Sequence, residues 1–583
     1  MVLRLSRRRD CLLTAVLLTV LFCLPYLAKD FLALEHDTLF HLSRIQGYGE
    51  ALGRLDILPA VYPYKNNGFG YGSPMFYCDL LLLPFSLAYL LGVPVSVCYT
   101  AAVFSAGLFS AYALLRLLSR FQIRYLSGLF LTAAFVFSNY RITDFYVRGA
   151  FGEGMAMGFL IVILIGLFDL LEAEKCERWH ILFFGLAGLI CTHNLSFLLG
   201  ALMTLLFVIG YSRRLTKPVF IAGLKAVLCA FLSTLWYTIP MMEQLGAQEL
   251  IVHYYATGSQ LEQYSLPLWK YFANTTVFGY GNNDYAKDLQ MTVNIGIALS
   301  LCGLLFPLVL RKKPKPDHMH FALVSWFIGL AAFLLPIDLV PWQQLAALRV
   351  LQFPWRLMTI ALILFPICGA LLLETLLDVL VSKLSAARAK QVAAAVSALL
   401  SAAVLTEGIW HLLPCFERTF GITSKTTWND ITSGAVVDPY YSASYMRVEL
   451  AGGDYLPWPS PDFRQLAPAV YDSSGTPIST AYEKNGTRLS VPASSLAGIG
   501  QDRIVELPLT WYKGYTAYSD GTKLPAEKSD RGLVIVHTVP DQDLTVVYQG
   551  TPLRTFCIFC SLLFWIGYGA FRIRRKDRHK TAE

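Results

Sequence analysis

Charged residues are scarce in this sequence. Asp, Glu, Lys and Arg make up only 15% of its 583 residues, whereas 55% are hydrophobic and the mean hydropathy is +0.49. A soluble protein carries about 25% charged residues and roughly 45–50% apolar ones. The shortage of charge excludes an ordinary soluble protein and predicts a chain that crosses a membrane several times.

The sequence also lacks several patterns that would indicate other chemistry. Its twelve cysteines fall mostly inside apolar runs, without the spacing of a disulfide framework or a metal site. The glycines at 68–72 follow no strand, so they do not form a nucleotide-binding loop. The net charge of +8 comes from short basic clusters between apolar runs, which is typical of membrane-orientation signals. We therefore expect no nucleic-acid partner.

Several apolar runs approach the roughly 20 residues that a membrane helix needs. The first has no good cleavage site after it, so we expect an uncleaved helix instead of a signal peptide. The candidate spans, about 12 in all, are residues 11–29, 97–118, 125–140, 153–172, 180–195, 196–212, 218–238, 291–311, 320–336, 356–380, 391–412 and 553–571.

The apolar run 75–92, which contains Asp79 and Pro84, decides the orientation. If it lies on the membrane surface or re-enters, every basic cluster falls on the side of Arg4 to Arg9. If it spans, every later cluster changes side, although each basic residue near an anionic leaflet contributes about 1 kcal/mol. We expect a surface-lying or re-entrant helix on the outer face, and cytoplasmic N- and C-termini. The main extracytoplasmic loops are then 30–96, 141–152, 239–290, 337–355 and 413–552.

The segment 413–552 differs from the rest in composition. It is rich in Ser, Thr, Gly, Pro and Tyr, and short alternating stretches such as "GLVIVHTV" are separated by turn signals such as "SDGT". This pattern predicts an extracytoplasmic β-sandwich-like domain. The expected protein is mainly α, with a membrane domain over 1–412, the β-rich domain over 413–552, and a last helix with a basic cytoplasmic tail over 553–583.

The first outer loop, 30–96, begins with the polar segment "EHDTLFHLSR". On a helix, Asp37, His41 and Arg44 would share a face at spacings of four and three. An acid beside a low-dielectric wall with imidazoles nearby suits proton transfer or metal binding, and an ordinary interfacial cluster is the alternative. Further along, Lys65 and Tyr71 lie in a loop that could contact a sugar or anchor its aromatics in the headgroup belt.

A second polar cluster lies at 140–156, "YRITDFYVRGAFGEGMA", with Asp144, Arg148 and Glu153 at the membrane boundary. Asp144 and Arg148 could form a simple i,i+4 ion pair. Alternatively, Arg148 binds a phosphate while the acids position an acceptor or a metal.

Two further outer segments carry candidate ligands. His193 in "CTHNLSF" is a candidate contact, although a lone histidine there is more often a packing residue. Arg349 and Arg356 in "ALRVLQFPWRLM" could bind a phosphate in a bidentate manner or extend toward the interface as ordinary anchors.

These motifs, taken in order, resemble a bacterial membrane family described as pyruvoyl-tetrahydropterin-synthase-related. The matching stretches are "HDTLFHLSRIQGYGEAL", "GFGYGSPMFYCDLLLLP", "YRITDFYVRGAFGE", "THNLSFLL" and "LQFPWRL", and the resemblance extends to about residue 380. The sequence contains no soluble pterin-synthase domain. That membrane family is similar to the GT-C glycosyltransferases, multi-span enzymes that usually take a sugar from a polyprenyl-phosphate carrier.

The resemblance implies roles for particular residues. In GT-C enzymes an acid early in the first outer loop commonly acts as base or binds metal, and Asp37 matches it, preceded by His36. Asp144 or Glu153 matches a second outer-loop acid, and these three are the expected catalytic residues. A divalent metal stays open, with Glu35, Asp37 and Asp144 as possible ligands. The expected substrate-binding residues are His36, His41, Arg44, Lys65, Tyr71, Arg148, His193, Arg349 and Arg356.

The resemblance also implies partners and a location. We expect a polyprenyl-phosphate-linked sugar donor and an envelope glycan, lipid or polymer acceptor, at the outer face of a bacterial plasma membrane. A flippase or transporter for lipid-linked sugars is the main alternative, but transporters usually bind near the midplane, whereas these ionisable groups lie at outer boundaries. A non-catalytic scaffold that binds envelope polymer is the third possibility.

Overall fold

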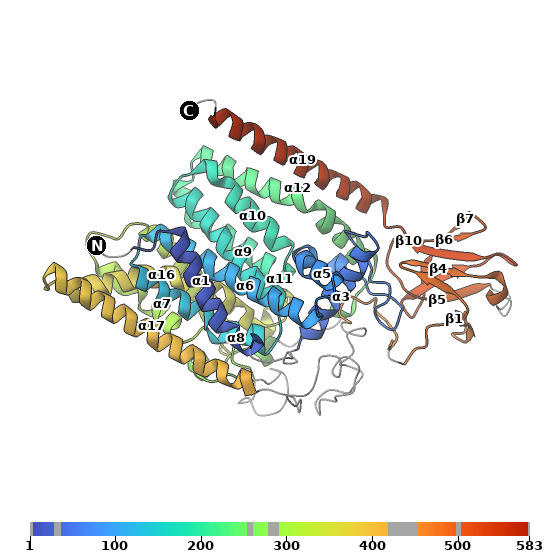
Figure 1. Cartoon of the computed structure of the whole chain (residues 1–583), viewed down its shortest axis with the longest axis horizontal. Coiled ribbons are helices and arrows are strands. Elements are labelled where there is room, and N and C mark those ends of the chain that lie inside the picture. The colour runs from blue at the N-terminus through green and yellow to red at the C-terminus, as the bar shows by residue number, and fades with distance from the viewer. Residues whose placement is uncertain are drawn as a thin grey trace. The chain divides into compact units, whose positions relative to one another are not determined.

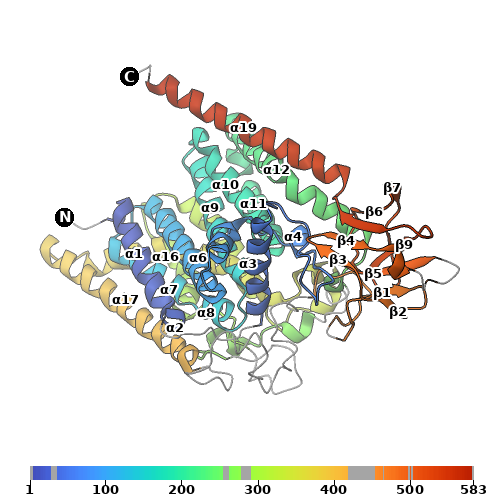
Figure 2. The ribbon, with the colours of Figure 1, turned by 45° about the vertical axis from the view of Figure 1, so that its right-hand side comes forward.

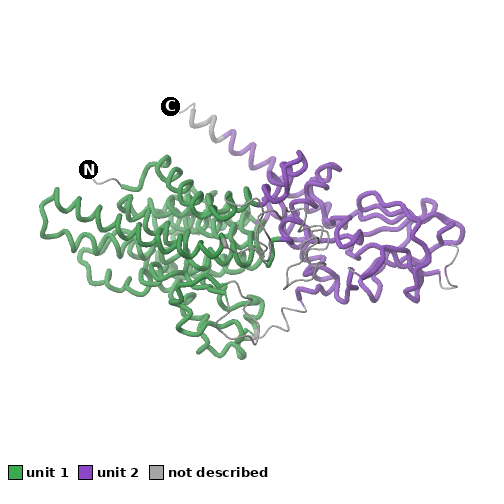
Figure 3. The backbone as a smooth tube through the Cα atoms, turned by 60° about the horizontal axis from the view of Figure 1, so that its bottom comes forward, with its two compact units in different colours: residues 1–38, 100–230, 259–425 green, residues 39–99, 231–258, 426–583 purple. Residues whose placement is uncertain are grey.

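The computed structural model describes residues 4–27, 36–253, 261–277, 291–417, 453–463, 465–496, 499 and 503–580. Within these ranges helices dominate, and the strands lie in the C-terminal part (Figure 1). The chain forms two compact units, coloured separately in Figure 3. Unit 1 is Met1–Thr38, Thr100–Ala230 and Ser259–Lys425, and unit 2 is Leu39–Tyr99, Phe231–Gly258 and Thr426–Glu583.

Each apolar run expected to span the membrane contains a helix. The helices in these runs are α1 (Arg8–Phe22), α2 (Leu24–Leu27), α6 (Val95–Leu118), α7 (Tyr125–Val136), α9 (Phe151–Leu167), α10 (Trp179–Ile190), α11 (Asn194–Gly210), α12 (Lys217–Ala247), α14 (Ile297–Leu305), α15 (Met319–Leu334), α16 (Met358–Val381), α17 (Ala386–Glu417) and α19 (Pro552–Lys580).

The expected number of about 12 spans is not reproduced by helix length. Within the described ranges, 6 helical segments are long and apolar enough to cross a membrane. They are Val95–Phe121, Phe151–Glu172, Lys217–Ala247, Pro354–Val381, Ala386–Phe416 and Pro552–Arg574. Others are shorter: α7 and α10 have 12 residues each. At 1.5 Å per residue, such a helix reaches about 18 Å of a hydrocarbon core of about 30 Å.

The ambiguous run 75–92 does not form one long helix. It contains the end of α4 (Ser73–Phe76), a 3-10 helix at Leu80–Leu82 and α5 (Leu83–Leu90). The 8 residues of α5 reach only about 12 Å, too little to cross the membrane.

Helix α16 forms the core of unit 1, because nearly all of its apolar side chains are buried. A helix that is hydrophobic on every side lies either in the interior of a protein or in a membrane. Glycines allow close packing here: a Cβ at Gly303 of α14 or Gly329 of α15 would lie 2.3 or 2.9 Å from the ring of Phe365. Small residues at such contacts let apolar helices approach one another. Figure 2 shows the unit 1 helices from a second direction.

Unit 2 contains two antiparallel sheets within residues 470–548, which confirm a β-sheet domain in the C-terminal part of the chain. Their strand orders are β2-β1-β5-β9-β8 and β3-β4-β10-β6-β7. Buried side chains alternate along β10, and Val546 pairs with Leu489 on one side and Ala517 on the other. The strands are β1 (Val470–Asp472), β2 (Pro477–Ser479), β3 (Glu483–Asn485), β4 (Arg488–Val491), β5 (Ile504–Thr510), β6 (Tyr515–Ser519), β7 (Thr522–Leu524), β8 (Glu527–Lys528), β9 (Leu533–His537) and β10 (Leu544–Tyr548).

From Leu39 onward, the first outer loop also belongs to unit 2. It forms α3 (Thr38–Gly53), and the aromatic-rich stretch that follows packs on the β-sheet domain. The Thr510 N–H donates to the Phe69 carbonyl at 2.8 Å, and the Gly72 N–H donates to the Tyr512 hydroxyl at 2.9 Å. A Cβ at Gly72 would lie 2.6 Å from the Tyr512 ring, so glycine is needed for this approach. The stretch is therefore part of a packed core.

Candidate functional site

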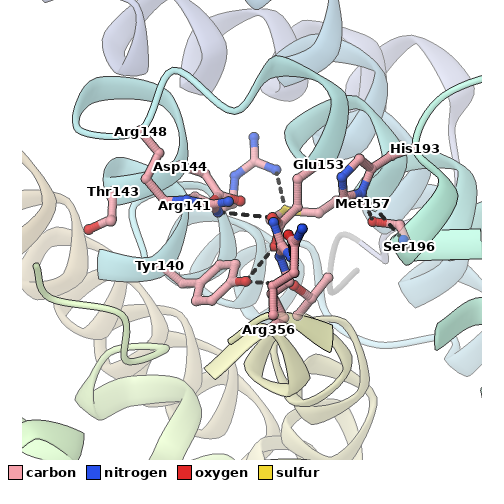
Figure 4. Close-up of polar contacts among 12 residues, drawn as sticks. Tyr140, Arg141, Thr143, Asp144, Arg148, Glu153, Met157, His193, Ser196 and Arg356 are labelled. Carbon is pink, nitrogen blue, oxygen red and sulfur yellow. Dashed lines mark hydrogen bonds and ion pairs between the residues drawn. The ribbon is translucent and has the colours of Figure 1, made fainter. Parts of the chain in front are cut away.

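Unit 1 brings the acids and arginines of the second outer segment into one buried cluster. Helix α8 (Asn139–Tyr146) begins at Ser138, whose hydroxyl accepts a hydrogen bond from the backbone N–H of Arg141. The chain then turns through Gly149, at φ +62°, and α9 begins at Phe151. Glycine adopts this left-handed conformation without strain. The turn brings Asp144, Arg148 and Glu153 together (Figure 4).

Glu153 is the centre of the cluster. One carboxylate oxygen accepts hydrogen bonds from the Tyr140 hydroxyl at 2.5 Å and the Thr359 hydroxyl at 3.2 Å. The other accepts from Nη1 of Arg148 at 2.9 Å and lies 3.6 Å from Nε of Arg356. The Glu153 side chain is only 2% exposed, so these groups replace water as its surroundings.

Arg148 binds two carboxylates with its side chain and the backbone of Asp37 with its own carbonyl. Its Nη1 donates to both Asp144 and Glu153, and its guanidinium lies 4.7 Å from the centre of the Trp355 ring. Its backbone carbonyl accepts from the Asp37 N–H at 2.7 Å. The charges of Arg148, Arg356 and Glu153 all act on the Asp37 carboxyl, which is half-buried. The acid expected from the first outer loop therefore lies beside the second polar cluster.

The protonation of the acids follows from this crowding. Burial, together with the negative charge of Glu153, raises the pKa of Asp144 well above its usual range. Its Oδ2 atom is buried and has no hydrogen-bond partner among the described residues. Carboxylates that share a site separate their pKa values, and one retains its proton. Burial also raises the pKa of Asp37, although Arg148 and Arg356 oppose it. We therefore assign the retained proton to Asp144.

Polar and aromatic residues hold Arg356 in place beside the cluster. The Arg356 guanidinium donates to the Leu351 carbonyl at 2.9 Å and to Gln352 Oε1 at 2.6 Å, and the rings of Phe353 and Trp355 stack 4.8 Å apart. These contacts fix the arginine that approaches Glu153, which a phosphate-binding group would need.

Two other predicted residues lie near this cluster. His193 precedes α11, and its Nδ1 lies 2.8 Å from the Ser196 hydroxyl (Figure 4). The same histidine interacts electrostatically with Glu153. His36 is bound through its backbone to the segment before Arg148, because its N–H donates to the Val147 carbonyl at 3.3 Å. Both belong to unit 1.

Two residues predicted to bind substrate, His41 and Arg44, belong to a buried network in unit 2, and a third, Lys65, is buried in the same unit with a different partner. Arg44 donates to Asp79 at 2.6 Å, and its Nη1 lies 3.0 Å from Nδ1 of His41. The Arg44 guanidinium also lies 4.0 Å from the centre of the Tyr77 ring. Lys65 donates to Gln46 at 2.7 Å. Asp37 immediately precedes α3, whereas His41 and Arg44 lie within it, three residues apart.

Tyr71 and Arg349 are also outside the cluster. Tyr71 is 1% exposed, and its hydroxyl accepts from the Tyr455 N–H at 3.3 Å, so its ring offers no face to a sugar. Arg349 is exposed on a 3-10 helix, and its side chain has no hydrogen bond or ion pair among the described residues.

Sequence reasoning missed three residues. Tyr140 and Thr359 donate to Glu153, and Asp79 pairs with Arg44. Tyr140 opens the same motif as Asp144, and Thr359 follows Arg356 at a helical spacing of three, so both could have been found. Asp79, a charge in an apolar run, was an equally visible signal.

The described residues do not form a metal-binding set. Across the described ranges, no group of three or more His, Cys, Asp or Glu side chains is arranged to hold a metal ion. Asp144 and Glu153 are instead bound to Arg148. Glu35, which was a possible metal ligand together with Asp37 and Asp144, lies outside the described residues.

Comparisons with known proteins give distant matches. No protein-family model matches the chain. An uncharacterized protein of Lactococcus lactis subsp. cremoris (strain MG1363) is 25% identical over 237 residues, which cover 39% of this chain and 38% of that protein. The cryo-EM structure of arabinofuranosyltransferase AftD from Mycobacteria is similar with a TM-score of 0.46 and 15% identity, over 73% of this chain and 28% of that one. The chain thus matches about a third of the length of either protein.

Proposed function

We propose that this chain is a membrane glycosyltransferase whose reaction centre is the Asp37, Asp144, Arg148, Glu153 and Arg356 cluster. The observation that carries the proposal is the pairing of Glu153 with both Arg148 and Arg356 beside the Asp37 carboxyl. The ordered motifs that resemble a GT-C-related family point to the same residues. The donor is a polyprenyl-phosphate-linked sugar, and the acceptor is a hydroxyl of an envelope glycan, lipid or polymer.

The charges of the cluster suit the release of a phosphate. With Asp144 protonated, the positive charges of Arg148 and Arg356 are balanced by Glu153 and Asp37. When Asp37 accepts a proton, the cluster gains one unit of positive charge. The departing phosphate gains one unit of negative charge in the same step, and preorganised positive groups stabilise such a charge without further rearrangement.

The proposed reaction has one displacement step. The acceptor hydroxyl loses its proton to the Asp37 carboxylate as its oxygen forms a bond to the anomeric carbon. The bond from that carbon to the phosphate oxygen breaks, and its electron pair leaves with the polyprenyl phosphate, so the anomeric configuration inverts. Arg148 and Arg356 neutralise the leaving group. No step in this scheme requires a metal, and none is assigned one.

The test is transfer by the purified full chain with a polyprenyl-phosphate sugar and an extracted envelope acceptor. Asp37→Asn should lower the transfer rate by about 10²–10⁴-fold, the range expected for a general base. The matched control is Asp338→Asn, which removes an exposed acid from the expected outer loop 337–355. Normal transfer by the Asp37 variant would rule out its role as the base.

The same assay separates the enzyme from a flippase. A transporter moves the lipid-linked sugar between membrane leaflets but forms no glycosidic bond. In detergent, where there are no leaflets, only an enzyme would give a product. Failure of the wild-type chain to transfer any sugar in detergent, combined with movement of the lipid-linked sugar across vesicle membranes, would replace the transferase proposal with the transporter.

A further inference from the structure

A groove of about 370 Å³ lies in unit 1 at the start of α12. Trp179 contributes from one side, and Lys217, Ile221, Ala222 and Lys225 contribute from α12. Most of the exposed surface in the groove is apolar, and the lysines supply the positive charge. None of these residues takes part in the Asp37 and Glu153 cluster.

The position of Lys225 requires an explanation. It lies eight residues after Lys217 on the same helix, about 12 Å further along at 1.5 Å per residue. The surrounding segment Lys217–Ala247 is apolar enough to span a membrane. Among the residues that the structure describes, neither lysine forms an ion pair with an acid. A charged group at membrane depth is unfavourable unless an anion or water reaches it.

An anionic lipid fits both features of the groove. The Trp179 ring and the Ile221 side chain form an apolar wall for an acyl chain, and Lys217 and Lys225 carry the charge that a phosphodiester requires. Lysine side chains can lie along apolar surface while their ammonium groups reach a headgroup. Basic pockets between membrane helices bind anionic headgroups in this way.

We propose that this groove binds one anionic phospholipid, through a phosphodiester headgroup between Lys217 and Lys225. The neighbouring basic residues Lys175, Arg213 and Arg214 belong to the clusters that we expect on the cytoplasmic side, so the lipid comes from the inner leaflet. The proposal is independent of the glycosyltransferase reaction, because it uses different residues and a different ligand.

The test is titration of the purified full chain with phosphatidylglycerol, read by native mass spectrometry. Phosphatidylethanolamine with the same acyl chains is the zwitterionic comparison. The wild-type chain should bind phosphatidylglycerol preferentially. The double variant Lys217→Gln, Lys225→Gln should weaken this binding roughly 30-fold, from the combined contributions of two basic residues near an anionic lipid.

Two further variants make the result specific. Ile221→Trp retains both lysines but fills the groove, so it should also weaken binding; its side chain is 39% exposed, which limits the effect on folding. Lys383→Gln removes an exposed lysine outside the groove and should leave the affinity unchanged. Circular dichroism and thermal unfolding show whether each variant is folded.

Three results would overturn the proposal. The first is wild-type affinity for phosphatidylglycerol in the folded double lysine variant. The second is equal affinity of the wild-type chain for the zwitterionic lipid. The third is complete competition by glycerol 3-phosphate at the same concentration, which would identify a soluble phosphate as the ligand.

Discussion

Exchanging Glu153 and Asp144 for their amides should have very different effects on stability. Glu153 is bound by Arg148, Tyr140 and Thr359 and approached by Arg356. Glu153→Gln removes the charge that balances two buried arginines. Asp144→Asn replaces a group that already holds its proton in our assignment, and the amide oxygen can still accept a hydrogen bond.

The magnitudes follow from the two environments. Removing one partner of a buried ion pair reduces the free energy of unfolding by about 3–5 kcal/mol. We expect the lower end for Glu153→Gln, because Asp144 no longer faces a negative neighbour and can ionise in its place. Asp144→Asn retains an oxygen that can accept from Arg148, so it should lower the free energy of unfolding by only about 1 kcal/mol.

The assay is reversible unfolding in mixed micelles, followed by tryptophan fluorescence, with both variants and the wild-type chain at pH 7. A larger loss for Asp144→Asn than for Glu153→Gln would refute our assignment of the proton. It would mean that Asp144, and not Glu153, carries the charge that balances Arg148.

The pH dependence gives a second readout of the same assignment. A carboxyl whose pKa is raised by folding binds more protons in the folded state than in the unfolded one. Its stabilising contribution is complete below the ordinary pKa of 3.8 and is lost as the pH rises toward the raised value. The wild-type chain should therefore lose stability over this window, by at most about 1.4 kcal/mol per pH unit from Asp144. Asp144→Asn should remove that part of the slope, and an unchanged slope would contradict the assignment.

Three other predictions concern single contacts. Tyr140→Phe removes a hydroxyl that donates to Glu153 and should lower the free energy of unfolding by about 1–3 kcal/mol in the same micelle assay. Asp79→Asn removes the carboxylate that pairs with the buried Arg44 and should lower the free energy of unfolding by about 3–5 kcal/mol. An unchanged free energy of unfolding would show that Asp79 does not neutralise Arg44 in the folded chain. The side chain of Lys484 is partly exposed, but burial of its ammonium group lowers its pKa to about 7. Between about pH 7 and 10.5 the unfolded chain therefore binds more protons at this residue than the folded chain, so stability should rise with pH. Lys484→Met should abolish that rise in a pH series of unfolding measurements.

The secondary structure could be predicted well from the sequence, because its signals are local. Apolar runs produced helices, and alternating stretches such as the one at 533–537 produced strands. Backbone hydrogen bonds in a helix join residues four apart, so the composition of a short stretch of sequence is sufficient to predict the helix. The number of spans was less predictable, because α7 and α10 end earlier than their apolar runs indicate.

The role of the first outer loop could not be predicted from its composition. Tyr71 and its neighbours have the Gly, Pro and aromatic content of a ligand-binding loop, yet they pack into the core of unit 2. Whether an aromatic ring is exposed depends on what covers it. The ring of Phe69 packs against Phe463, which is almost four hundred residues away in the sequence. Such burial leaves no mark in the nearby sequence.

The sequence by itself determined the apolar helices, the β-rich domain and the polar segments that contain Asp37, Asp144 and Glu153. These features depend on hydrophobicity and on hydrogen bonds between near neighbours. Only the tertiary structure decided that Glu153 is the centre, because Thr359 reaches it from 206 positions away and Arg356 from the same later segment. Only the structure paired Arg44 with His41 and Asp79. Electrostatic partners inside a protein are chosen by distance in space, which chain order does not encode.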